Sequence, residues 1–219
     1  MSRIPEVVVV LHGLGRSPLS MLRLAQALRR EGYAVKNWGY KSFVGGIEDK
    51  VTDLRLRLLE LKGYTKVHAV GHSLGGLILR GLLTEKTGLP LGRIVFLGTP
   101  HKGASVINRN PALFNHKRIP RIIRELEADS PAIAALGLPP MEIGVVAGVE
   151  QLSPFNPVSW LNRRVLGDEL HDGTVEVASA RLDGQMKDYL EVPVNHSFLP
   201  LSRKVIDPTV RFIRKGKFR

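Results

Sequence analysis

The chain contains no cysteine among its 219 residues. This absence excludes a disulfide framework, a thiolate metal site and a catalytic thiol, so covalent chemistry has to come from serine, threonine, lysine or a carboxylate. Long hydrophobic runs are absent as well. The first apolar run, Val7 to Leu11, is too short and too rich in β-branched residues for a signal peptide or a membrane span. We therefore expect a cytoplasmic protein.

Acidic residues are scarce relative to basic ones. Lys and Arg total 32 against 20 Asp and Glu, which gives a formal net charge of +12. Many of the basic residues lie near the C-terminus, where a solvated helix face is the simplest interpretation and peripheral contact with an anionic membrane is the functional alternative. Nucleic-acid binding is not expected, because no zinc-finger spacing, aromatic RNA-binding signature or helix-turn-helix pattern accompanies the charge.

Short β-branched runs alternate along the chain with stretches of helical periodicity. This alternation predicts a mostly parallel sheet with helices on both faces. Because no linker or internal repeat interrupts the pattern, residues 1–219 are expected to form one domain. The expected strands are Val7–Leu11, Ala34–Trp38, Lys66–Gly71, Arg93–Leu97, Ile143–Ala147 and Tyr189–Val192, and the expected helices are Ser17–Glu31, Ile47–Lys62, Leu74–Lys86 and Ser202–Phe212.

The segment 103–140 interrupts this alternation with two weak helical pieces, Ile119–Ala128 and Ser130–Leu136. An insertion between two strands of such a sheet is expected to form a short lid or a wall of the substrate site. Its apolar side chains predict either an acyl pocket or ordinary core beneath a loop. They include Val106, Ile107, Leu113, Phe114, Ile122, Ile123 and Leu126.

The sequence Gly71-His72-Ser73-Leu74-Gly75 follows a predicted strand directly and precedes a predicted helix. A serine at such a sharp turn has a strained backbone, and the flanking glycines avoid the collisions that larger side chains would make. The turn raises the hydroxyl above the sheet, so Ser73 is the candidate nucleophile. The Leu74 amide points into the same space, and the Leu14 amide, in the glycine turn after the first strand, is the candidate second donor to an oxyanion.

A serine nucleophile needs a histidine base that is oriented by a carboxylate, and the expected chain order is Ser, acid, His. His196 is the only histidine after position 171 and is the candidate base. Asp172, in a turn before it, is the candidate acid, with Asp168 as the next choice. His12 is a competing histidine, but it is expected to orient its own loop. The other competing histidines are His68, His72, His101 and His116, and the other competing acids are Asp183 and Asp188.

With these residues identified, the chain resembles the bacterial lipases and lipase-like α/β-hydrolases. The resemblance covers nearly the full length and implies an α/β-hydrolase fold. The segment that begins at Gly98 is more discriminating than the sequence around Ser73. The matching motifs are Leu11-His12-Gly13-Leu14, Gly71-His72-Ser73-Leu74-Gly75-Gly76, Leu97-Gly98-Thr99-Pro100-His101-Lys102-Gly103, and Asp172-Gly173-Thr174-Val175 followed by Asn195-His196-Ser197-Phe198.

This resemblance implies hydrolysis of carboxylic esters, from lipids or small molecules, through an acyl-enzyme intermediate that needs no metal or organic cofactor. The chain is shorter than typical secreted lipases and has neither a disulfide nor a paired acidic motif for calcium. An esterase for small or monoacyl substrates is therefore as plausible as an interfacial lipase. Two alternatives stay open: an acyltransferase with the same triad, and a non-catalytic binding protein on a hydrolase fold.

Overall fold

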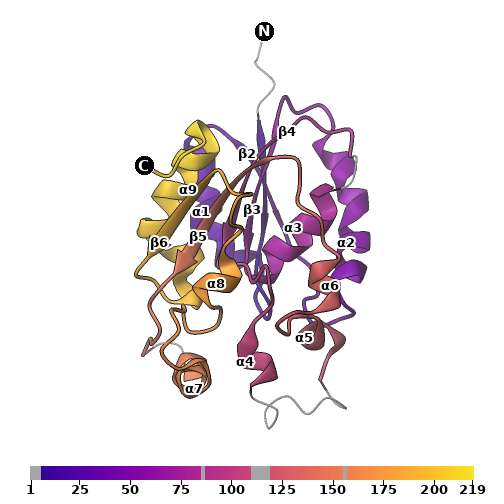
Figure 1. Ribbon diagram of the computed structural model, residues 1–219. Coiled ribbons are helices and arrows are strands. Elements are labelled where there is room, and N and C mark those ends of the chain that lie inside the picture. The colour runs from indigo at the N-terminus through magenta and orange to yellow at the C-terminus, as the bar shows by residue number, and fades with distance from the viewer. Residues whose placement is uncertain (1–5, 85–86, 110–118, 155–156) are drawn as a thin grey trace.

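A six-stranded sheet forms the centre of the molecule (Figure 1). The computed structural model describes residues 6–84, 87–109, 119–154 and 157–219. The strand order is β2-β1-β3-β4-β5-β6, and every neighbouring pair is parallel, which confirms the predicted parallel sheet. All expected strands are present with small shifts at their ends. They are β1 (Val7–Leu11), β2 (Ala34–Trp38), β3 (Val67–His72), β4 (Leu91–Leu97), β5 (Glu142–Gly148) and β6 (Asp188–Val192).

Both faces of the sheet are covered by helices, and β1 shows why. All five of its residues are buried, and alternate side chains point to opposite faces. Val7 and Val9 belong to the core cluster beneath α2 (Ile47–Arg55) and α3 (Leu74–Thr84). Val8 and Val10 belong to the opposite cluster, beneath α1 (Leu22–Arg30) and α9 (Arg203–Lys215).

Several predicted helices are shorter than their apolar patterns suggest. The expected helix from Ser17 begins with the 3-10 helix Pro18–Met21 before α1, and the one from Ile47 ends in the 3-10 helix Leu56–Leu61 after α2. A further 3-10 helix, His196–Leu201, precedes α9. The last helix, α9, extends three residues beyond the expected end at Phe212 and stops at Gly216, which has the left-handed conformation (φ 74°) in which glycine has no steric penalty.

The insertion 103–140 contains α4 (Ser105–Asn108), α5 (Arg121–Glu125) and α6 (Pro131–Ala134). Residues 110–118, which include Leu113, Phe114 and His116, lie outside the described residues. A second helical segment, between β5 and β6, was not predicted. It contains α7 (Pro157–Leu166) and α8 (Val177–Ala180). A proline at the first position of α7 and a glycine just after its end are signals that could have identified this helix.

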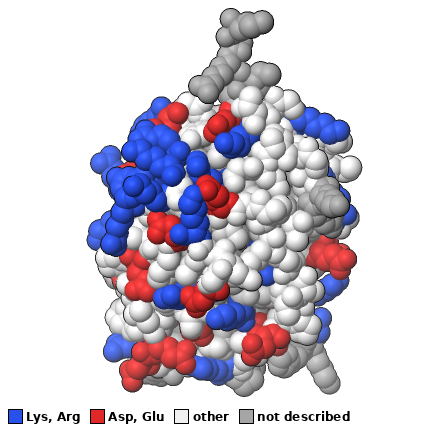
Figure 2. Space-filling model, turned by 45° about the horizontal axis from the view of Figure 1, so that its top comes forward, with Lys and Arg blue, Asp and Glu red and all other residues white. Residues whose placement is uncertain are grey.

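Basic side chains gather over α9, toward the amino ends of the strands (Figure 2). This helix has 13 residues and is therefore roughly 20 Å long. The Arg93 guanidinium, near the start of β4, donates a 2.9 Å hydrogen bond to the Ile213 carbonyl, which places the end of α9 beside the beginning of that strand. In the part of the chain that the structure describes, no helix is both long and apolar enough to cross a bilayer.

Candidate active site

Ser73 lies between the last residue of β3 and the first residue of α3, as the motif predicts. Its φ angle is 53°, in the left-handed region that a residue with a side chain seldom adopts. The Ser73 amide donates a 2.9 Å hydrogen bond to the Leu97 carbonyl at the end of β4. The neighbouring strand therefore holds the strained turn in place.

Three glycines allow this turn to pack against its neighbours. A Cβ atom on Gly71 would lie 2.5 Å from the Gly76 Cα atom, and one on Gly75 would lie 2.5 Å from the His12 carbonyl oxygen. A Cβ atom on Gly76 itself would overlap the Thr99 side chain. The motif is therefore required by the close approach of β3, α3 and the first loop.

The structure brings Ser73, His196 and Asp172 together from three separate parts of the chain. The His196 Nδ1 atom is 2.7 Å from Asp172 Oδ2, and the His196 Nε2 atom is 3.0 Å from Ser73 Oγ. An ionised carboxylate accepts hydrogen bonds and cannot donate them, so His196 Nδ1 carries the proton. His196 Nε2 is then the acceptor that faces the serine hydroxyl. This is the arrangement that a histidine base requires.

The Asp172 carboxylate is buried and held in a fixed orientation. Its Oδ1 atom accepts hydrogen bonds from the Thr174 amide (3.1 Å) and the Val175 amide (2.8 Å), which leaves Oδ2 for the imidazole. The backbone of the same residue accepts a 2.8 Å hydrogen bond from the His196 amide.

The competing carboxylates are located elsewhere. Asp183 pairs with Arg181, and Asp188 accepts a hydrogen bond from the Phe218 amide. Asp168 is exposed.

The first loop is fixed around His12, as the sequence predicts. The His12 ring stacks on the Tyr40 ring with centroids 4.3 Å apart, and the Tyr40 hydroxyl donates a 2.6 Å hydrogen bond to the His12 carbonyl. The Nδ1 atom of His12 lies 2.9 Å from the Gly13 carbonyl oxygen and therefore donates to it. Burial lowers the pKa of His12, which favours a neutral ring. The base is instead identified by geometry, because His196 Nε2 lies 3.0 Å from Ser73 Oγ, whereas His12 Nε2 has no hydrogen-bond partner among the described residues. Among the described residues, the amides of Leu14 and Leu74 have no hydrogen-bond acceptor.

His72 orients the backbone of His196. Its Nε2 atom donates to the His196 carbonyl over 3.0 Å, and the two rings lie 4.9 Å apart between centroids. Complete burial lowers the pKa of His72 well below its usual value, and the neighbouring His196 and Arg16 lower it further. His72 is therefore neutral, and its role at the site is to position the His196 backbone.

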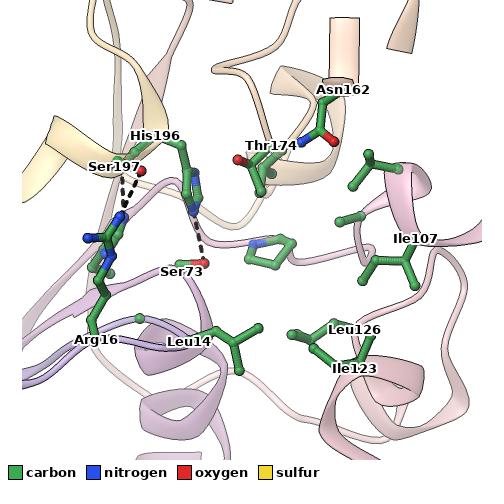
Figure 3. Close-up of a pocket in the computed structure, with 16 residues that line it drawn as sticks. Leu14, Arg16, Ser73, Ile107, Ile123, Leu126, Asn162, Thr174, His196 and Ser197 are labelled. Atoms are coloured by element: carbon green, nitrogen blue, oxygen red, sulfur yellow. Dashed lines mark hydrogen bonds between the residues drawn. The ribbon is translucent and has the colours of Figure 1, made fainter. Parts of the chain in front are cut away.

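A cavity of about 320 Å³ opens beside Ser73 (Figure 3). Its walls come from the first loop, the loop after β4, the described part of the insertion, the segment between β5 and β6, and the loop after β6. The predicted acyl-pocket residues Val106, Ile107, Ile123 and Leu126 line this cavity, whereas Ile122 is fully buried in the core. Sequence reasoning assigned no site role to four polar lining residues. Thr174 and Ser197 lie in the matching motifs, and Arg16 and Asn162 lie outside them.

Arg80 anchors the end of the insertion to α3. This arginine is buried and donates hydrogen bonds to the carbonyls of Leu136 (2.6 Å) and Gly137 (3.0 Å). Its guanidinium also contacts His101 Nδ1. Burial, and next the charge of Arg80, lower the pKa of His101 well below its usual value, so His101 is a neutral structural residue. No group of three potential metal ligands occurs in the described residues.

Comparison with known proteins agrees with this geometry. The model of the palmitoyl protein thioesterase family matches residues 7–132, more than half of the chain. The chain belongs to the palmitoyl protein thioesterase family. Within this family's fold, the matched region contains the first loop, the Ser73 turn and the first part of the cavity wall. No curated protein matches the chain significantly.

Solved structures show the same fold. The mature lipase BlEst2 from Bacillus licheniformis has a TM-score of 0.74 at 20% identity, covering 96% of this chain and 93% of that one. The lin2722 gene product from Listeria innocua has a TM-score of 0.64 at 21% identity, covering 98% and 94%. A metagenomic carboxyl esterase, MGS0156, has a TM-score of 0.71 at 15% identity, covering 90% and 65%. Together with the family match, these relatives confirm the resemblance to lipase-like α/β-hydrolases.

Proposed function

We propose that this protein is a serine hydrolase that cleaves carboxylic esters through an acyl-enzyme intermediate on Ser73. One observation carries the proposal. The Ser73 hydroxyl lies 3.0 Å from His196 Nε2, whose Nδ1 lies 2.7 Å from Asp172, and the serine lines a largely apolar cavity. Nucleophile, base and orienting acid within hydrogen-bond reach are what acyl transfer from an ester requires.

In the first half of the reaction, Ser73 Oγ attacks the carbonyl carbon and its proton passes to His196 Nε2. The amides of Leu14 and Leu74 donate to the oxyanion of the tetrahedral intermediate. The carbon–oxygen bond to the alcohol breaks as His196 returns its proton to the leaving oxygen. Asp172 stabilises the transient imidazolium and keeps its ring in the correct orientation.

In the second half, water replaces the alcohol. It gives a proton to His196 and attacks the acyl carbon, and the bond between that carbon and Ser73 Oγ breaks. His196 then returns the proton to Ser73, and the carboxylic acid leaves. Neither half needs a metal or an organic cofactor.

The cavity supports a monoacyl substrate. A volume of about 320 Å³ lies at the small end of the range for ligand sites, which is roughly 300 to 1,000 Å³. Its walls are apolar on the side of the insertion. The family match adds a second candidate, hydrolysis of long-chain acyl thioesters, because the same attack on a thioester carbonyl releases a thiol.

The test is hydrolysis of chromogenic acyl esters from acetyl to palmitoyl, with matched acyl thioesters, by the wild type and by Ser73→Ala. We expect hydrolysis by the wild type and its loss in the variant, and Asp172→Asn is expected to reduce kcat by about three to four orders of magnitude. A fluorophosphonate probe should label the wild type at Ser73.

The two substrate series separate the candidates. A higher kcat/KM for thioesters at equal acyl length would favour the thioesterase, and the reverse would favour the esterase. Added alcohol should not divert the acyl group from water; formation of a new ester instead of acid would identify an acyltransferase. Equal activity in the wild type and Ser73→Ala would refute the proposed nucleophile.

A further inference from the structure

One positive charge lies at the candidate site, and the proposed reaction does not use it. Arg16, two residues after Leu14 in the first loop, lines the cavity beside Ser73. Among the described residues that line this cavity, it is the only one with a permanently charged side chain. No aspartate or glutamate is among these lining residues, and the buried carboxylate of Asp172 is already bound to His196.

The guanidinium of Arg16 is only partly engaged. Its Nη2 atom donates a 2.9 Å hydrogen bond to the Ser197 hydroxyl, and the side chain is exposed. No carboxylate in the described parts of the chain forms an ion pair with it. An arginine carries five N–H donors, so most of them stay available to a bound molecule. The contact with Ser197 holds the group beside His196 rather than over the apolar wall.

The cavity therefore has two chemically different sides (Figure 3). Ile107, Ile123 and Leu126 lie on one side of Ser73, and Arg16 and Ser197 lie on the other. An acyl chain among the apolar residues places its carbonyl carbon at Ser73. The leaving group of the same ester then extends toward Arg16.

We propose that Arg16 selects esters whose leaving group carries an anionic oxygen group, a phosphate or a carboxylate, close to the scissile bond. This inference rests on the proposed function of Ser73. A guanidinium binds both kinds of group through paired hydrogen bonds. The substrate class is thus a monoacyl ester of an acidic alcohol, such as a monoacyl glycerol phosphate.

The first experiment compares three esters with one acyl chain: dodecanoyl glycerol, dodecanoyl glycerol phosphate and the dodecanoyl ester of glyceric acid. Each is assayed in monomeric form with the wild type, Arg16→Gln and Arg16→Lys. Arg23→Gln is the matched control, because it removes the same charge from an exposed residue of α1 outside the cavity. The measured quantity is the ratio of kcat/KM for each anionic ester to that for the neutral ester.

We expect a ratio above one in the wild type, a fall of about tenfold in Arg16→Gln and partial recovery in Arg16→Lys. Arg23→Gln should keep the wild-type ratio. The better of the two anionic esters identifies phosphate or carboxylate as the preferred group. An equal loss for neutral and anionic esters in Arg16→Gln would overturn the proposal, because Arg16 would then only hold Ser197 and His196 in place.

The second experiment measures binding without turnover. Ether analogues, dodecyl glycerol and dodecyl glycerol phosphate, are titrated into Ser73→Ala and into Ser73→Ala with Arg16→Gln by calorimetry. Tighter binding of dodecyl glycerol phosphate than of dodecyl glycerol by Ser73→Ala, with the difference lost when Arg16→Gln is added, supports the anion site. This result would stand even if the wild type hydrolysed no ester, and in that case only the proposed reaction would fail. Equal affinity of the two analogues for Ser73→Ala would overturn the anion site while leaving the hydrolase intact.

Discussion

The strained backbone of Ser73 predicts that two inactive variants differ in stability. Ser73→Ala keeps a side chain in the left-handed conformation (φ 53°), whereas Ser73→Gly removes it. Both lose the hydrogen bond to His196 equally. The left-handed conformation costs an L-residue about 1 to 2 kcal/mol. Replacing alanine by glycine removes this cost, but it also makes the unfolded chain more flexible, which lowers the free energy of unfolding by about 0.4 to 1 kcal/mol.

The glycine variant should therefore be more stable than the alanine variant by about 0.5 to 1 kcal/mol. In a protein of this size that difference raises Tm by roughly 2 °C. Urea unfolding at neutral pH measures it directly, and the m-values of the two variants should agree, so that the midpoints alone report the difference.

The matched control is Ala27→Gly in the middle of α1. In a regular helix, replacing alanine by glycine lowers the free energy of unfolding by about 1 kcal/mol. The change in stability at Ala27 therefore has the opposite sign to that expected between the two Ser73 variants. If Ser73→Gly were instead less stable than Ser73→Ala by the amount seen at Ala27, the strained turn and the reasoning built on it would be wrong.

Three further predictions concern the cavity, acid stability and the basic surface. Ile123→Trp should fill the acyl side of the cavity and lower the ratio of kcat/KM for dodecanoyl to butanoyl esters by tenfold or more. Burial lowers the pKa of His72 and of His101 well below 6.5, so below that pH the unfolded chain binds more protons than the folded protein does. The free energy of unfolding should therefore fall as the pH decreases from 6.5, by up to about 1.4 kcal/mol per pH unit for each histidine. Charge reversal at Lys215 and Lys217 should weaken sedimentation with anionic vesicles without changing hydrolysis of a soluble ester, because the end of α9 contacts the start of β4 whereas Ser73 contacts its other end.

Each of these predictions has a decisive contrary result. A parallel loss for long and short esters in Ile123→Trp would mean that the residue supports the fold rather than the acyl chain. A free energy of unfolding that stays constant down to about pH 5.5 would contradict buried neutral histidines. Vesicle binding that is insensitive to salt, or unaffected by charge reversal, would exclude an electrostatic contact through α9.

Most of the fold was predictable, because local patterns encode burial. The β-branched run at Val7–Leu11 gave the same strand bounds that the structure has. Helix α7 was missed, although Pro157 and Gly167 mark its ends. The 3-10 helices before α1 and after α2 were also missed, since their apolar spacing differs little from that of an α-helix.

The candidate catalytic residues also differ in how far the sequence alone identified them. The sequence by itself determined the elbow, because Gly71, Ser73 and Gly75 meet a local steric requirement, and it determined His196 through chain order and the scarcity of later histidines. The sequence also favoured Asp172 over Asp168, Asp183 and Asp188, but only the tertiary structure shows which carboxylate lies beside His196, because that depends on how the loops pack together.

The position of Arg16 was also decided only by the tertiary structure. It is separated by 181 residues from Ser197, its hydrogen-bond partner. A local pattern records burial and periodicity, whereas such a contact depends on the parallel direction of the strands, which brings the loops after β1 and β6 to the carboxyl edge of the sheet. The apolar and charged sides of the cavity exist only once that edge has formed.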